Sequence, residues 1–352
     1  MFQGFTRRTR TEDAPSEGEA DLRPDVAPAV DAQSEVEPPW KAGRKGGPKI
    51  ALALGGGAAR GFAHIGVMRT LEAHGIRPSV IAGTSIGAVV GGIWAAGKLD
   101  ALEDWARGLN KRNILGFLDL SLGAAGLIAG RRLMERMRLE LGDLTIEDLP
   151  VVFGCIATEL GTGHEIWLTR GELVEAIHAS YCLPGIFTPA KVGGRWLMDG
   201  TLVNPVPVSA ARALGGRIVI AVNLNSEIFG RGTVIQDHGS AIAEVADVVV
   251  EHQKQGLSRM LRPDRMLRRQ FLSGPSEGPR GISAVMIDAF NITQDRIARS
   301  RLAGDPPDVT VSPKLSKIGL FDFHRAEEAI AAGREAVERI VDDVHSAMEA
   351  LK

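Results

Sequence analysis

A serine lies at the centre of the stretch GTSIG, with Gly83 two residues before Ser85 and Gly87 two residues after it. This spacing, between an apolar strand and a helix, is typical of a nucleophile elbow, where a sharp turn projects the hydroxyl at the end of the strand. The first amides of the following helix favour negative charge near that hydroxyl. The alternative is that Ser85 or Thr84 only caps the helix. These five residues alone leave both interpretations open.

A second glycine-rich segment, LGGGAARG at Leu54–Gly61, also connects a predicted strand to a predicted helix. It lacks the G-K-[ST] ending of a P-loop, and Arg60 occupies the position of the third glycine in the dinucleotide fingerprint. Its backbone amides can instead form an oxyanion hole, as a glycine-rich loop does in many serine esterases. Arg60 can position this loop, meet an anionic group of a substrate, or form an ordinary salt bridge at the helix N-terminus.

A nucleophilic serine needs a base. None of the eight histidines lies in a loop context that supplies one, and His64 and His178 fall within predicted helices, which favours a packing role. Asp199 ends an apolar strand and precedes Gly200, and two nearby prolines prevent a regular helix directly after it. Asp199 is therefore the candidate base, although an Asp-Gly pair also forms plain β-turns.

The elements that must position these residues alternate between strand and helix. Continuous apolar runs predict buried strands, glycines end two predicted helices, and shorter strands are expected near an edge. The predicted strands are 50–54, 78–83, 150–158, 163–169, 191–200 and 217–224, and the predicted helices are 62–74, 86–96 and 171–179. Strand and helix alternating at short spacing predict an α/β fold with a mostly parallel central sheet and helices on both faces.

Composition divides the chain into three parts. Residues 1–47 are rich in Pro, Glu, Asp, Ala and Ser and predict a disordered tail. Residues 48–225 are expected to form the catalytic core, with the motifs within 51–211, and residues 226–352 are expected to complete the same domain with helices. Within that last part, 241–260 and 325–351 have helical periodicity.

Global properties exclude several classes of protein. The 352 residues carry a formal net charge of -2, which gives no indication of a nucleic-acid partner. No apolar run is long enough to span a membrane and no signal-peptide pattern is present, so we expect a cytoplasmic protein. Cys155 and Cys182 lie in apolar segments, which argues against a disulfide framework. No clustered metal ligands are visible, and neither a metal nor a cofactor is expected.

A basic stretch, SRMLRPDRMLRRQF at Ser258–Phe271, alternates arginines with Met, Leu and Phe. Such a segment can lie on an anionic membrane surface, which would make the protein peripheral to the inner face of the membrane. The alternative is a solvated helix and loop whose apolar side faces the core.

Taken together, the motifs GGGAARGFAHIGV, GTSIGA, ASYCLPGIF and DGTLVNPVPV, in that order, resemble the patatin-like phospholipase family. The resemblance is to the bacterial branch related to neuropathy target esterase, and it covers roughly residues 50–335. It implies a three-layer, modified α/β-hydrolase fold with a Ser-Asp dyad and no catalytic histidine. By position, it implies Ser85 as nucleophile and Asp199 as base, with further residues around them. The implied oxyanion amides are those of Gly55, Gly56, Gly57 and Ala58, and the supporting residues are Arg60, Gly83, Gly87 and Gly200.

The chain departs from the resemblance at Thr201, where the family usually has glycine or alanine after Asp-Gly. A larger, β-branched residue there is expected to crowd the loop or alter its turn. The sequence therefore predicts a serine hydrolase of phospholipids, lysophospholipids or other acyl esters. The alternative is a weakly active or inactive scaffold with a regulatory or lipid-binding role.

Overall fold

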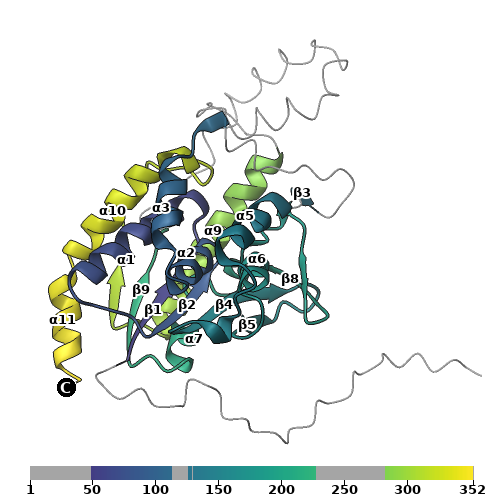
Figure 1. Ribbon diagram of the computed structural model, residues 1–352. Helices are drawn as coiled ribbons and strands as arrows, with labels where there is room; N and C mark the ends of the chain where they lie inside the picture. The colour runs from purple at the N-terminus through teal and green to yellow at the C-terminus, as the bar shows by residue number, and fades with distance from the viewer. Residues whose placement is uncertain (1–48, 113–125, 129, 227–281, 352) are drawn as a thin grey trace, which may run out of the picture. The chain divides into compact units, whose positions relative to one another are not determined.

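An eight-stranded mixed sheet forms the centre of the computed structural model, which describes residues 49–112, 126–128, 130–226 and 282–351 (Figure 1). The strand order is β10-β9-β1-β2-β4-β8-β7, and β5 also pairs with β4. The strands are β1 (Ile50–Leu54), β2 (Val80–Thr84), β4 (Val152–Glu159), β5 (Glu165–Leu168), β7 (Ala190–Val192), β8 (Arg195–Asp199), β9 (Ile218–Val222) and β10 (Val309–Val311). The run from β10 to β4 is parallel, whereas β5, β8 and β7 pair antiparallel. The predicted mostly parallel sheet is confirmed.

The two faces of the sheet differ in the size of their side chains. In β1, Leu52 and Leu54 pack into the larger core, whereas Ala51 and Ala53 belong to a second, smaller core. The whole strand is buried, so its sequence is a continuous apolar run without polar alternation. The small residues let helices approach closely on the second face.

Helices cover both faces and give the three layers. The larger core includes residues of α1 (Ala63–Ala73), α2 (Ile86–Ala95), α3 (Leu99–Arg107), α5 (Arg131–Leu141), α6 (Leu173–Tyr181), α10 (Ala326–Glu338) and α11 (Val341–Glu349). The opposite face is covered by α7 (Val208–Ala213) and α9 (Ile282–Gly304). The helices α1 and α10, far apart in the sequence, lie side by side (Figure 1). A separate two-stranded parallel sheet joins β3 (Gly126–Ile128) to β6 (Gly185–Phe187).

Two predicted elements are wrong in detail. The single strand expected at 191–200 is a hairpin of β7 and β8, because Gly193 and Gly194 have φ of 57° and 83° and form the turn. The single helix expected at 325–351 is two helices, α10 and α11. Asp342 and Asp343 lie in the first turn of α11, where they favour a new helix start.

Some predictions fall outside the described residues. These are the disordered tail at 1–47, the helix at 241–260 and the basic stretch at 258–271.

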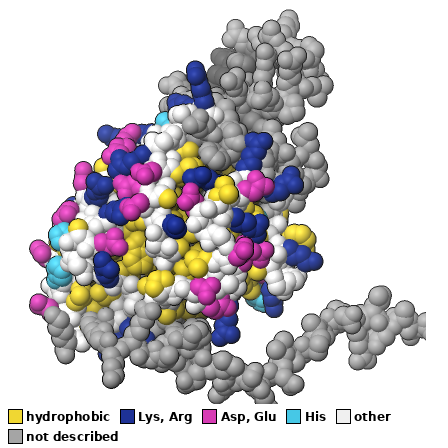
Figure 2. Space-filling model, in the orientation of Figure 1, with side chains coloured by type: hydrophobic (Ala, Val, Ile, Leu, Met, Phe, Trp, Pro, Cys, Tyr) yellow, Lys and Arg dark blue, Asp and Glu magenta, His cyan; other side chains and the backbone are white. Residues whose placement is uncertain are grey.

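Among the helices that the structure describes, none is long and apolar enough to cross a membrane. On the face shown in Figure 2, positive and negative side chains are intermixed. Ion pairs among the described residues include Arg138 with Glu172 and Arg107 with Glu103.

The register of the sheet brings two loops and one strand end together. The strands β1 and β2 are parallel neighbours, so the segments that follow Leu54 and Thr84 leave the same edge. Thr84 pairs with Ile156 of β4, and the next residue of β4, Ala157, pairs with Asp199 of β8. The strands β2 and β8 therefore pair with consecutive stretches of β4, and β8 begins to pair where β2 ends. This places Asp199 beside Ser85, the residue after Thr84.

Candidate active site

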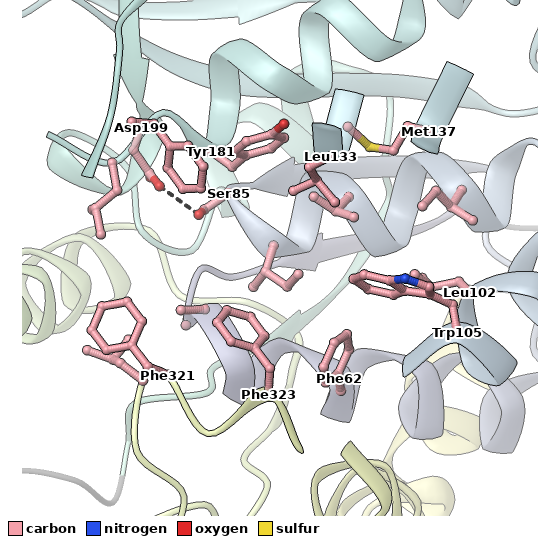
Figure 3. Close-up of a pocket in the computed structure, with 18 of the residues that line it drawn as sticks. Phe62, Ser85, Leu102, Trp105, Leu133, Met137, Tyr181, Asp199, Phe321 and Phe323 are labelled. Carbon is pink, nitrogen blue, oxygen red and sulfur yellow. Dashed lines mark hydrogen bonds between the residues drawn. The ribbon is translucent and has the colours of Figure 1, made fainter. Parts of the chain in front are cut away.

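Ser85 and Asp199 are joined by a hydrogen bond at this edge of the sheet. Ser85 Oγ donates to Asp199 Oδ2 at 2.7 Å (Figure 3). Both side chains are buried, with 9% of Ser85 and 2% of Asp199 exposed. The structure thus brings together the two residues that the sequence singled out, although they are 114 positions apart. The pair has the arrangement of a nucleophile and its base.

The backbone of Ser85 adopts a conformation that L-residues rarely occupy. Its φ of 56° and ψ of −122° form a sharp turn between β2 and α2. Its amide donates to Ser180 Oγ at 2.9 Å, and Ser180 Oγ donates in turn to the carbonyl of Ile156 at 2.6 Å. The side chain of Ser85 makes no capping hydrogen bond to α2. Ser85 thus occupies the N-cap position of α2, but its hydroxyl is bonded to Asp199 and does not cap the helix.

The glycines around Ser85 are required by close backbone packing. A Cβ on Gly87 would lie 2.1 Å from the carbonyl oxygen of Leu54, and a Cβ on Gly83 would lie 2.6 Å from the amide nitrogen of Ala88. Backbone atoms cannot move aside without shifting a strand or a helix. The turn is thus held in place by the packing of its neighbours against one another.

Asp199 has an environment that makes it a stronger base than an ordinary aspartate. Burial raises the pKa of its carboxyl to about 6, although hydrogen bonds from Ser85 and Thr201 act in the opposite direction. Its Oδ1 accepts from Thr201 N at 2.8 Å and from Thr201 Oγ1 at 2.6 Å. Gly200 begins the 3-10 turn η4 (Gly200–Leu202), which gives the loop its shape. A carboxyl group with a pKa near neutrality is suited to accept and return a proton.

Two of the four amides in the glycine loop after β1 are not free to take the role predicted for them. The amide of Gly55 donates to Val222 O at 3.1 Å, and the amide of Gly56 donates to Pro205 O at 3.0 Å. Both amides are used by the sheet and its neighbouring loop, so the prediction that they surround an oxyanion is wrong. Gly57 and Ala58 line the same cavity as Ser85. They lie at the start of the 3-10 turn η2 (Ala58–Phe62), where amides have no acceptor within the helix.

Arg60 supports the glycine loop from behind. Its Nε donates to Ile318 O at 2.8 Å and its Nη1 donates to Asn225 Oδ1 at 3.2 Å. Asn225 Nδ2 donates in turn to Gly56 O at 3.3 Å. Burial lowers the pKa of the guanidinium to about 10, so it remains charged at neutral pH. Of the three interpretations of Arg60, these contacts favour the positioning of the loop.

His64 is also a loop support. Its Nε2 lies 2.7 Å from Gly55 O, and complete burial lowers the pKa of the imidazole to about 4, which keeps it neutral. His178 lies in α6 beside Cys182 and Tyr181. His324 lines the cavity, but no histidine in the described part of the chain is hydrogen-bonded to Ser85. The described geometry pairs Ser85 with a carboxylate.

Ser85 and Asp199 lie at one end of a largely apolar cavity of about 420 Å³. Figure 3 shows Ser85 and Asp199 at one end and side chains of α3 and α5 at the other. Phe62 packs edge to face against Trp105 and Phe323, with ring centroids 6.2 and 6.1 Å away. Further apolar lining comes from Leu102, Leu133 and Met137. This shape and lining suit a hydrocarbon chain attached to a polar group at Ser85.

Comparison with known proteins agrees with these observations. A family model for patatin-like phospholipases matches residues 52–212. An uncharacterised NTE family protein of Mycobacterium tuberculosis is 33% identical over 85% of this chain and 94% of its own length. The chain belongs to the patatin-like phospholipase family.

Other relatives are more distant. The neuropathy target esterase sws of Drosophila melanogaster is 30% identical over 51% of this chain and 13% of its own length. Among solved structures, VipD from Legionella pneumophila covers 84% of this chain and 67% of its own, with 12% identity and a TM-score of 0.42. Membership of the patatin-like phospholipase family indicates a hydrolase of lipid esters.

Several site residues of this patatin-like chain escaped the sequence analysis. The described helices α3 and α5 were not predicted, although both have the apolar spacing that packs one helix face against a core. From the C-terminal part, Phe290, Gln294 and Phe323 reach the cavity. Nothing local in the sequence around Gln294 indicates that this residue reaches Thr201.

Proposed function

We propose that this chain is a serine acyl-ester hydrolase that acts on phospholipids, lysophospholipids or similar lipids through a Ser85–Asp199 dyad. One observation carries the proposal: a strained, buried serine donates a 2.7 Å hydrogen bond to a buried carboxylate at one end of a largely apolar cavity. A buried serine and aspartate held in this way favour covalent catalysis at an ester carbonyl.

In the first half of the reaction, Ser85 Oγ attacks the carbonyl carbon of the ester while Asp199 Oδ2 accepts the hydroxyl proton. The carbonyl oxygen becomes an oxyanion, which the amides of Gly57 and Ala58 and the N-terminal end of α2 stabilise. The C–O bond to the leaving alcohol then breaks. Asp199 gives its proton to that alcohol, and the acyl group remains on Ser85.

In the second half, a water molecule attacks the acyl carbonyl and gives its proton to Asp199. The bond between the acyl carbon and Ser85 Oγ breaks, and Asp199 returns the proton to Ser85. The product is a fatty acid, which loses its remaining proton to solvent and leaves as a carboxylate. The hydrocarbon chain occupies the apolar cavity, where each buried methylene contributes roughly 0.8 kcal/mol to binding.

Active-site labelling tests this proposal. A fluorescent fluorophosphonate should label the wild-type chain, and labelling should disappear in Ser85→Ala. Hydrolysis of p-nitrophenyl acyl esters should fall by about 10⁴-fold in Ser85→Ala and by a similar factor in Asp199→Asn. Ser79→Ala is the matched control, because the hydroxyl of Ser79 makes a long, 3.5 Å hydrogen bond to Ile50 O and Ser79 lies outside the cavity lining.

Equal labelling of wild type and Ser85→Ala would disprove the nucleophile. A folded wild-type chain that takes up a fluorescent lipid but shows neither labelling nor hydrolysis would favour the alternative of a lipid-binding scaffold. Thr201, which motivated that alternative, makes hydrogen bonds to Asp199 that are compatible with an active base.

A further inference from the structure

A chain of hydrogen bonds runs from α9 to the nucleophile through Thr201. Gln294 Nε2 donates to Thr201 Oγ1 at 2.9 Å, and Thr201 Oγ1 donates to Asp199 Oδ1 at 2.6 Å. The other carboxylate oxygen, Oδ2, accepts from Ser85 Oγ. All four side chains are at least nine-tenths buried. A threonine at this position therefore does more than fill space beside the dyad.

The donor inventory fixes the direction of each bond. An ionised carboxylate can only accept, so the single hydroxyl proton of Thr201 is directed to Asp199 Oδ1. The lone pairs of Thr201 Oγ1 then remain for a donor, and the amide nitrogen of Gln294 supplies one. If Gln294 presented its oxygen instead, it would compete with Asp199 for the same proton. Gln294 thus selects the rotamer in which Thr201 serves the base.

The methyl group of Thr201 also has a defined contact. A Cβ on Gly56 would lie 2.2 Å from Thr201 Cγ2, so the methyl group occupies the space that a side chain at position 56 would need. Thr201 thus touches the glycine loop with its methyl group and Asp199 with its hydroxyl. One side chain fixes the spacing between the base and the loop that carries Gly57 and Ala58.

We propose that Thr201 and Gln294 are positioning residues, which hold Asp199 Oδ1 so that Oδ2 alone faces Ser85 and receives its proton. This inference rests on the proposed Ser85–Asp199 dyad. A glycine or alanine at position 201 would retain the backbone donor and lose the hydroxyl. The threonine therefore adds a second donor to Oδ1.

The hydroxyl of Thr201 should affect how the reactivity of Ser85 depends on pH. A hydrogen bond to the charged form of a carboxyl lowers the pKa of that carboxyl, so removal of the Thr201 hydroxyl should raise the pKa of Asp199. The decline in the reactivity of Ser85 at low pH, which is the acid limb of its pH profile, should then move to higher pH. A bond to a charged group corresponds to a shift of about one pH unit or more. A residue that only supported the fold would lower the melting temperature without moving the limb.

The experiment measures the rate of fluorophosphonate labelling of Ser85 from pH 4.5 to 9 in the full chain. Thr201→Val keeps the shape and removes the hydroxyl, and its acid limb should move up by about one pH unit. Thr201→Ser keeps the hydroxyl, and its limb should stay near that of wild type. Because Thr201→Val leaves Gln294 Nε2 buried without its acceptor, Thr201→Val/Gln294→Leu is tested beside it. The double variant should show the same shifted limb.

Gln294→Leu alone should shift the limb less than Thr201→Val, because the hydroxyl of Thr201 remains and only its orientation is released. A wild-type limb in both Thr201→Val and the double variant would overturn the inference, as would an equal shift in Thr201→Ser and Thr201→Val. These results are distinct from failure of the dyad itself. In that case the wild-type chain would show no labelling that depends on Ser85.

Discussion

The two strand-to-helix connections at the edge of the sheet are held by different sets of contacts. The loop after β1 contains three glycines and is supported from outside by side chains, namely His64 on Gly55 O and Asn225 on Gly56 O. The turn after β2 is a single residue, Ser85, fixed by the backbone packing of Gly83 and Gly87. Both start from neighbouring parallel strands, and both reach the same cavity.

The difference matches what each connection is proposed to do. The serine must present one oxygen atom in one direction, and close packing against β1 and α2 fixes that direction. The loop must present amides to a negative charge that forms during the reaction. Supporting hydrogen bonds hold these amides in the required orientation before that charge forms. An atom added to the turn should therefore lower stability, whereas removal of a side chain that supports the loop should lower activity before it lowers stability.

The largest effect is expected for the turn. Gly87→Ala places a methyl group 2.1 Å from the carbonyl of Leu54, so β1 or α2 must shift. We expect a loss of about 3 kcal/mol or more in the free energy of unfolding, measured by urea denaturation. Gly304→Ala is the control, because no atom lies within 4 Å of the added carbon and its effect should stay within about 0.5 kcal/mol. Equal stabilities of the two variants would contradict the packing argument.

A smaller effect is expected for the loop. Asn225→Ala removes the donor to Gly56 O and a partner of Arg60, and we expect kcat/KM to fall by about ten- to a hundredfold with a near-normal melting temperature. Asn225→Asp retains an acceptor for Arg60 but cannot donate to Gly56, and it should be impaired to a similar extent. If Asn225→Asp kept wild-type activity, the contact with Arg60 rather than with Gly56 would be the important one.

The smallest effect comes from pH alone. Asp199 must be ionised to act as a base, so kcat/KM should decline below the pKa of about 6, by about tenfold at pH 5. The pKa of Asp199 is raised by folding from 3.8, so its protonation stabilises the folded state and this group does not unfold the protein in acid. His64, with a pKa of about 4, titrates lower. A decline centred near pH 4 would assign the profile to His64, which supports the loop, instead of Asp199.

The sequence predicted what local patterns can encode. The glycine spacing around Ser85 indicated a tight strand-to-helix turn, and the apolar strand before Asp199 placed that residue at a strand end. The hairpin at Gly193–Gly194 was also within reach, because adjacent glycines between two short apolar segments favour a two-residue turn. These features depend on neighbours in the chain.

The features that the sequence did not predict depend on contacts between residues that are distant in the chain and meet only in the folded protein. The amides of Gly55 and Gly56 were misassigned because their acceptors, Val222 O and Pro205 O, are set by the pairing of β9 with β1 and by a distant loop. The contact between Gln294 and Thr201 joins residues 93 positions apart. No periodicity in either segment specifies such a contact.

The position of α9 and α10 late in the chain has a consequence for synthesis. Both members of the proposed dyad have been synthesised once the chain reaches residue 199. Other parts of the site come from residues beyond 282, namely Gln294, Phe323 in the wall of the cavity, and α10, which packs against α1. Until these later residues have been synthesised, the cavity lacks part of its described lining. Synthesis of Ser85 and Asp199 therefore does not by itself complete the proposed site.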